Sequence, residues 1–158
     1  MGLRIKSGLA VTALFALVYA LVFVIGVYNN WGWWIMVLLT LGIVLLQYLI
    51  SPLIISWIYR IDWIPNDEFH SYFPHLARVV DKVVEKEGIK YPKIGIIHDL
   101  NPNAMAFGWS KNSARIVFTE GITEYCNERE QQAVLAHECG HVVHNDFILM
   151  TVVFAVPL

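Results

Sequence analysis

Two histidines and a glutamate stand out in residues 133–146, AVLAHECGHVVHND, because the surrounding segment is largely apolar. Residues four positions apart on a helix project from nearly the same face, so the imidazoles of His137 and His141 can reach one metal ion. Glu138 can approach a water bound to that metal and take its proton. This His-Glu-x-x-His (HExxH) spacing predicts that His137 and His141 bind one Zn²⁺ per chain. It also predicts Glu138 as the general base of a hydrolase.

The alternative is a helix whose two histidines and glutamate are only solvated or hydrogen-bonded. The residues between and around them are uncharged, which is typical of a helix buried on most sides. Burial without a metal would leave three polar groups to satisfy, so the metal site is the favoured interpretation.

The remaining histidines and cysteines do not extend this pattern. His144 lies roughly 10 Å from His137 on a straight helix, and Cys139 points about 200° away from it. We therefore expect a surface or packing role for His144 and a core position for Cys139. Two cysteines are too few for a disulfide framework. Cys126 has no partner at metal spacing, and structural or surface roles are expected for the isolated residues His70, His75 and His98.

Several elements should position this site. Asn127 and Glu130 form a capping-box pattern, which predicts a helix running through His141 to at least Asn145. Apolar spacing predicts an amphipathic helix over residues 72–87, capped by Gly88. A short buried strand is expected at residues 93–98. Residues 104–109 and 115–121 are expected to form a hairpin of two further strands.

Two apolar stretches precede this region. Residues 8–28 and 33–59 are each long enough to cross a hydrocarbon core of about 30 Å as a helix, and the short turn between them predicts a hairpin. Aromatic residues at both ends resemble the belts of membrane interfaces. Pro52 should kink or end the second helix. A cleaved signal peptide is the alternative for residues 8–28, but their apolar core is too long for one.

Charge indicates the orientation of this hairpin. Before Arg60 the only charged side chains are Arg4 and Lys6, so the positive-inside rule places both ends and the following domain in the cytoplasm. The predicted location is the cell (plasma) membrane, with several passes. The net charge of −2 gives no electrostatic case for nucleic acid. A membrane metal sensor or transporter is disfavoured because residues 8–59 contain no Asp, Glu, Lys, Arg or His.

The longer segments NPNAMAFGWSKNSARIVFTEGI and NEREQQAVLAHECGHVVHNDFILMT resemble the HtpX-type membrane zinc metalloproteases, relatives of the CAAX prenyl endopeptidases. The family's NAFA-type strand corresponds to residues 103–106, its Thr-Glu-Gly turn to residues 119–121, and its aspartate after the second histidine to Asp146. The resemblance implies an α+β membrane protein. An N-terminal transmembrane helical hairpin would be followed by a zincin-like domain with a small sheet and a metal-binding active-site helix.

The resemblance also implies roles for residues outside the motif. In that family the NAFA-type strand offers an edge to substrate backbone, so the expected substrate-binding residues are Asn103, Ala104, Met105 and Ala106. A plain core strand is the alternative. The implied substrates are polypeptides, above all misfolded membrane proteins, and the implied process is protein quality control. Asp146 points about 140° from His141 on a straight helix, so spacing gives it no role at the metal.

One departure concerns the third zinc ligand, which in the family is a glutamate on a later helix. No residue after Asp146 has a zinc-binding side chain, so we expect this ligand downstream of Leu158. The expected organisation is two transmembrane helices (1–60), a partial cytoplasmic zinc metallopeptidase domain (61–146) and the start of a third transmembrane helix (147–158). The predicted function is a membrane-anchored zinc endopeptidase. The alternative is a catalytically incomplete membrane fragment that acts at most as an interaction partner.

Overall fold

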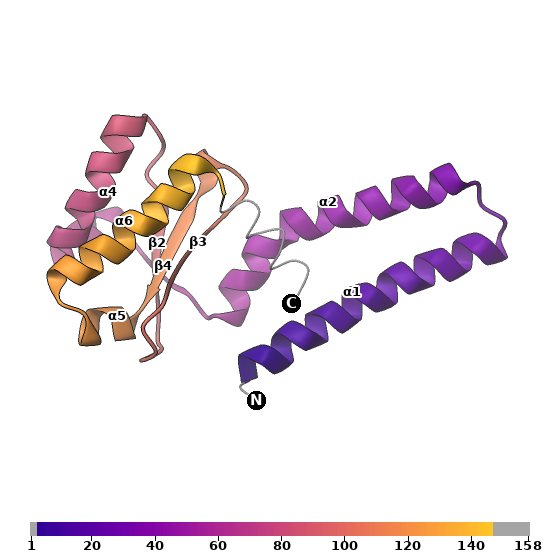
Figure 1. Cartoon of the computed structure of the whole chain (residues 1–158), viewed down its shortest axis with the longest axis horizontal. Coiled ribbons are helices and arrows are strands. Elements are labelled where there is room, and N and C mark those ends of the chain that lie inside the picture. The colour runs from indigo at the N-terminus through magenta and orange to yellow at the C-terminus, as the bar shows by residue number, and fades with distance from the viewer. Residues whose placement is uncertain (1–2, 147–158) are drawn as a thin grey trace. The chain divides into compact units, whose positions relative to one another are not determined.

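The computed structural model describes residues 3–146, and these form two compact units that divide between Ser51 and Pro52 (Figure 1). The first unit contains α1 (Leu3–Tyr28) and most of α2 (Trp33–Ile58). The second contains the last turns of α2, a small sheet and four further α-helices. The fold is therefore of the predicted α+β class. The expected start of a third transmembrane helix, residues 147–158, lies outside the described residues.

Helices α1 and α2 follow the two apolar stretches. They are joined by a tight turn in which Asn30 has a positive φ of 51°. The Tyr19 hydroxyl donates a hydrogen bond to Gln47 Oε1 at 2.7 Å, and the Gln47 side chain is buried. This hydrogen bond determines which sides of α1 and α2 face each other, because each polar group would otherwise lack a partner between two apolar helices.

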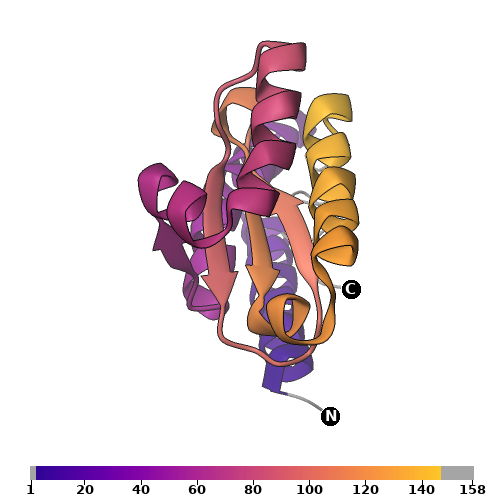
Figure 2. The ribbon, with the colours of Figure 1, turned by 90° about the vertical axis from the view of Figure 1, so that its left-hand side faces the viewer.

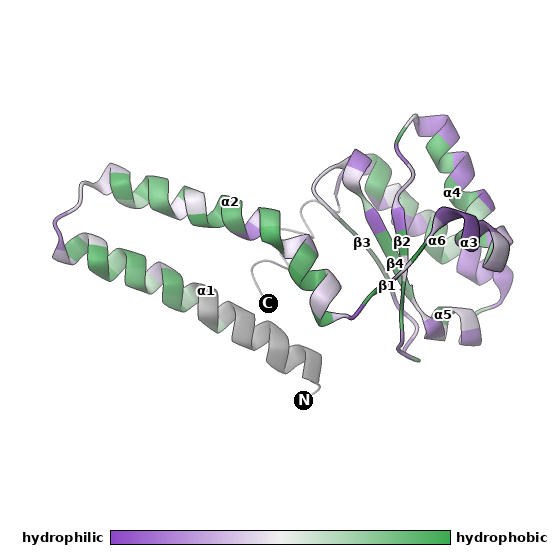
Figure 3. Ribbon diagram, turned by 180° about the vertical axis from the view of Figure 1, so that it is seen from behind, coloured by the Kyte–Doolittle hydropathy of each residue, from purple (hydrophilic) through white to green (hydrophobic). Residues whose placement is uncertain are grey.

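Helix α2 continues through Pro52 to Ile58, so of the two predicted effects, a kink or an end, the proline does not end the helix. Proline has no N–H to donate to the carbonyl four residues earlier. The Ser51 hydroxyl donates to that carbonyl, Tyr48 O, at 3.3 Å. Among the described residues α2 is the one helix with the length and apolar composition of a membrane span (Figure 3). A core helix of a soluble protein meets the same criteria of length and composition.

The sheet of the second unit has four strands in the order β1-β2-β4-β3. β2 and β4 are parallel, and the two outer strands are antiparallel to their neighbours. The β3–β4 pairing confirms the predicted hairpin. The strands are β1 (Asp62–Ile64), β2 (Lys93–Ile97), β3 (Ala104–Phe107) and β4 (Arg115–Thr119).

Helices α4 (Pro74–Glu87) and α6 (Glu128–His144) lie side by side on one face of this sheet (Figure 2). The predicted amphipathic helix begins at Pro74, and Gly88 caps it with a φ of 60°, as expected. The core beneath these helices is built from alternate strand residues and the apolar stripes of both helices. Its fully buried members include Phe69, Leu76, Val80, Ile94, Ile116, Phe118 and Leu135.

Sequence periodicity did not reveal four short elements. These are β1, α3 (Asn66–Tyr72), the 3-10 helix η1 (Lys111–Ser113) and α5 (Glu120–Tyr125). β4 ends at Thr119, two residues earlier than predicted, because Glu120 already opens α5. β3 ends at Phe107 because Gly108 adopts a φ of 150°, where an added Cβ would meet the backbone of Ser113. Elements of three to seven residues are too short to carry a recognisable period.

A cluster of charged side chains joins β1, the end of β2 and the start of α5 at one end of the sheet. His98 follows β2, and its Nε2 lies 2.7 Å from Asp62 Oδ2 on β1. Its Nδ1 lies 2.5 Å from Glu120 Oε1 at the start of α5. The bonds to Asp62 and then to Glu120 raise the pKa of this exposed imidazole above its usual 6.5. The imidazolium form bonds both carboxylates, so protonation of His98 tightens the end of the sheet.

We expect His98→Gln to lower the melting temperature of the full chain in detergent at about pH 6 and to have little effect at about pH 9. A raised folded-state pKa gives stability that is fully present below the unfolded pKa and is lost as pH rises through the folded pKa. Asp67→Asn, which removes an exposed carboxylate outside the cluster, is the control. An equal loss at both pH values would show that the histidine charge is not involved.

Candidate metal and active site

Helix α6 begins with the predicted capping box. The Asn127 side chain accepts from the N–H groups of Arg129 and Glu130 at 3.0 and 3.1 Å, and Glu130 Oε2 accepts from the Asn127 N–H at 2.9 Å. Gln131 then ties the first turn to its surroundings, with Nε2 donating to the Cys126 carbonyl at 2.7 Å and Oε1 lying 2.8 Å from His75 Nε2. The start of α6 is therefore held against α4, and this sets the positions of the later turns.

The two predicted metal ligands face each other one turn apart. His137 Nε2 and His141 Nε2 are 3.1 Å apart, and with Glu138 they offer ligand atoms within 4.8 Å of one another. Two nitrogens bound at about 2.0–2.1 Å to a tetrahedral zinc lie roughly 3.3 Å apart. The two imidazoles therefore fit a shared Zn²⁺ with little rearrangement.

Glu138 points to the sheet side of α6, where 9% of its surface is exposed. Its carboxylate accepts a hydrogen bond from the backbone N–H of Ala106 on β3. Burial raises the pKa of Glu138, and the two histidines and the Ala106 N–H oppose this effect. The sequence predicted a helix buried on most sides. That holds for the side bearing Glu138, whereas His137 lies on an exposed side.

Asp146 contacts the site, and sequence reasoning missed this. Helix α6 ends at His144, one residue earlier than predicted, and Asn145 follows in the left-handed conformation with a φ of 61°. The chain leaves the helical path there, and Asp146 Oδ2 lies 3.0 Å from His141 Nδ1. This bond lowers the pKa of Asp146 and leaves His141 Nε2 for a metal. An asparagine after the last helical turn was the available signal, because asparagine tolerates this conformation.

The predicted substrate-binding residues lie on or beside β3, which is an edge strand. The backbone of Asn103 faces β4, since its carbonyl accepts a hydrogen bond from the Thr119 N–H at 2.9 Å. Antiparallel pairs alternate, so Met105 also faces β4, whereas the backbones of Ala104 and Ala106 face the outer edge. The Ala106 N–H is the group that bonds Glu138.

The Thr-Glu-Gly turn holds the loop that leads into β3. The buried Thr119 hydroxyl donates to the Asn101 carbonyl at 2.8 Å and accepts from the Asn103 N–H at 2.8 Å. The Gly121 N–H donates to the Asp99 carbonyl at 3.0 Å. An added Cβ at Gly121 would overlap the backbone of Leu100. The threonine and the glycine of this turn therefore hold the loop that positions the edge strand β3.

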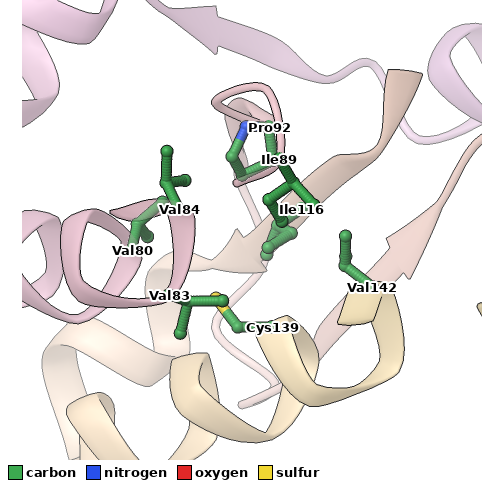
Figure 4. Close-up of a pocket in the computed structure, with 8 residues that line it drawn as sticks. All are labelled: Val80, Val83, Val84, Ile89, Pro92, Ile116, Cys139 and Val142. Atoms are coloured by element: carbon green, nitrogen blue, oxygen red, sulfur yellow. The ribbon is translucent and has the colours of Figure 1, made fainter. Parts of the chain in front are cut away.

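The other candidates stay outside the site. Cys139 is 2% exposed and lines an apolar recess between α4, α6 and the sheet (Figure 4). Burial raises the pKa of its thiol to about 12, so it is a core residue as predicted. His144 is exposed, and its Nδ1 lies 3.2 Å from the carbonyl of Gly140 on its own helix. His70 is exposed and contacts Asp81, which fits the expected surface role.

A family profile and several known proteins match this chain, and the matches agree with one another. The profile described as Peptidase family M48 matches residues 71–157. A protease HtpX homolog of Methanothermobacter thermautotrophicus is 39% identical over 99% of this chain and 59% of its own length. A second homolog, from Picrophilus torridus, is 31% identical over 98% of this chain and 50% of its own length. Protease HtpX of Pseudoalteromonas atlantica is 40% identical over 49% of this chain and 27% of its own length.

Thr119→Val should lower the free energy of unfolding by about 1 kcal/mol, because it removes the partner of the part-buried Asn101 carbonyl and Asn103 N–H. Thr123→Val is the matched control, since that half-buried hydroxyl bonds only the Glu120 carbonyl of its own helix among the described contacts. Denaturant unfolding of the full chain in detergent measures both. An equal loss of free energy of unfolding in the two variants would show that the bonds of Thr119 to the loop before β3 add no particular stability.

Asp146→Asn should weaken metal binding by about 10- to 100-fold, because an amide orients and polarises the His141 ring less well than a carboxylate. Competition with a zinc chelator measures the affinity. Glu124→Gln, an exposed carboxylate on α5, is the control. Unchanged affinity in Asp146→Asn would show that the bond to His141 has no influence on the metal.

Proposed function

Because this chain belongs to Peptidase family M48 and is of the HtpX type, we propose that it carries the active-site helix of a membrane-anchored, zinc-dependent endopeptidase. One observation supports this most directly. Two imidazole nitrogens converge at 3.1 Å on α6, while the glutamate between them contacts the edge strand β3. A metal-dependent hydrolase of peptide bonds needs its metal, a base and a place for extended substrate within reach of one another.

In this proposal His137 and His141 hold the zinc through Nε2. Bound there, zinc would supply a Lewis acid and a water of lowered pKa. Glu138 takes the proton of the attacking water and delivers it to the leaving amine. Its buried position and raised pKa suit this exchange, because the carboxyl can hold a proton more readily than an exposed glutamate. Asp146 orients His141.

The outer edge of β3 is the proposed substrate site. The backbone of Ala104 and the carbonyl of Ala106 face that edge, and no strand pairs there among residues 3–146. An extended polypeptide can add to it as a further strand. Since Glu138 bonds the same strand, the substrate backbone would be aligned beside the base. Asn103 and Met105 act in this scheme by keeping β3 paired with β4.

Catalytic zinc usually has three protein ligands, and the described residues bring together two histidines. The chain spans about half the length of the relatives that match nearly all of it. We place the third ligand in a later segment, downstream of Leu158. The family membership favours this over an inert membrane fragment that acts only as an interaction partner.

Helices α1 and α2 are the proposed anchor, with the catalytic unit on the cytoplasmic side of the cell membrane. The apolar length of α2 and the cations Arg4, Lys6 and Arg60 support this orientation. An anchored protease meets other membrane polypeptides at high local concentration, so the proposed substrates are misfolded membrane proteins.

Zinc analysis of the protein that includes the segment downstream of Leu158, purified in detergent, tests the metal site. We expect bound zinc in the unaltered chain and its loss in His137→Ala, because one imidazole cannot hold the ion. His144→Ala is the matched control, since His144 is exposed on the same helix and bonds only a helix carbonyl among the described contacts. Equal zinc in the unaltered chain and His137→Ala would contradict the proposed ligand.

Glu138→Gln separates metal binding from catalysis. It should keep its zinc, whereas zinc-dependent cleavage of casein should fall by about 10²- to 10⁴-fold with the loss of the general base. Cleavage that survives in Glu138→Gln would rule out Glu138 as that base.

A further inference from the structure

The sheet has a second face, opposite α4 and α6, with a different character. Alternate strand residues point to it, and a separate buried cluster forms there from Ile97, Phe107 and Val117 together with Ile55 of α2 and Ile61. Trp63, Met105 and Tyr59 pack around this cluster. Gly95 allows the close approach, because an added Cβ would overlap Ile61 and Trp63. The last turns of α2 thus cover part of this face.

The polar groups beside this cluster are cations lying on aromatic rings. The Arg115 guanidinium lies 4.9 Å from the ring centroid of Trp109 and 5.8 Å from that of Trp63. Lys93 Nζ lies 4.4 Å from the centroid of Trp63. Within residues 3–146 neither cation forms an ion pair. We call Trp63, Lys93, Trp109 and Arg115 the cationic–aromatic surface.

This surface is tied to the end of α2. Arg115 Nη1 donates to the Pro52 carbonyl at 3.0 Å, and Pro52 belongs to the same compact unit as the sheet. Trp57, near the end of the helix, is 81% exposed, and Arg60 follows with its side chain exposed. Tryptophan, tyrosine and basic side chains gather where a membrane helix leaves the hydrocarbon. The cationic–aromatic surface therefore continues the interfacial end of the proposed anchor.

We propose that the cationic–aromatic surface docks on the anionic lipid headgroups of the leaflet in which α2 ends. This inference rests on the proposed anchor. Anionic headgroups supply the charge that Lys93 and Arg115 lack within the described residues, and tryptophan rings settle at headgroup level. Docking would hold the sheet against the bilayer by the face opposite α6, so the catalytic helix would point away from the lipid.

A spin label reports whether this surface touches headgroups. The label is placed on the full chain at Asn112→Cys, in the exposed turn next to Trp109, in a Cys126→Ser background. A second label at Glu85→Cys, exposed on α4, is the control. The chain is reconstituted in phosphatidylcholine with and without phosphatidylglycerol, and collisions with a nickel-chelating headgroup lipid are measured. We expect collisions at position 112 to rise with phosphatidylglycerol and those at position 85 to stay low.

Substitution of one cation tests the charge dependence. Lys93→Gln should lower the ratio of docked to undocked protein about fivefold, since each basic residue near an anionic surface contributes about this factor. Lys82→Gln, an exposed lysine on α4, should have no effect. If neither phosphatidylglycerol nor Lys93→Gln changes the collision rate at position 112, the docking proposal is overturned. This face would then be covered by a later part of the chain or by a protein partner.

Alkaline carbonate washing distinguishes this failure from failure of the anchor. A chain that stays with the vesicles but shows no headgroup contact at position 112 is anchored without docking, which overturns only this inference. A chain that washes off the vesicles overturns the anchor and the docking together.

Discussion

The hydrogen bond from the Ala106 N–H to the Glu138 carboxylate is the contact on which the site depends. It joins the helix that carries the histidines to the strand proposed to bind substrate. A buried carboxylate without such a donor would be costly, so helix and strand are held in one arrangement. The spacing of the HExxH motif places the imidazoles on a common side of α6, and this bond joins that helix directly to β3.

The loop before β3 shows how that arrangement is maintained. An edge strand of four residues has one neighbour and few ladder bonds of its own, so its register needs support from outside the strand. Thr119 provides it by bonding Asn101 and Asn103, and Gly121 lets the Leu100 backbone pass closely. Motif positions that look remote from the metal therefore act on the strand that Glu138 contacts.

Much of this could be predicted from sequence, and the exceptions have local causes. The capping box, the amphipathic α4, the β3–β4 hairpin and the buried Cys139 follow from short-range patterns, and all are present. The contact of Asp146 with His141 could not be obtained from helical angles, because one left-handed residue, Asn145, changes the direction of the chain. The tie of Arg115 to Pro52 joins residues 63 positions apart, and no local pattern encodes such a pair.

The two faces of the sheet divide the work of the catalytic unit. One face packs against α4 and α6 and so positions the proposed metal ligands. The other face packs against the last turns of α2, where Arg115 fixes the Pro52 carbonyl. Because one sheet carries both contacts, the distance from the end of α2 to the site is set by packed secondary structure and not by a flexible linker.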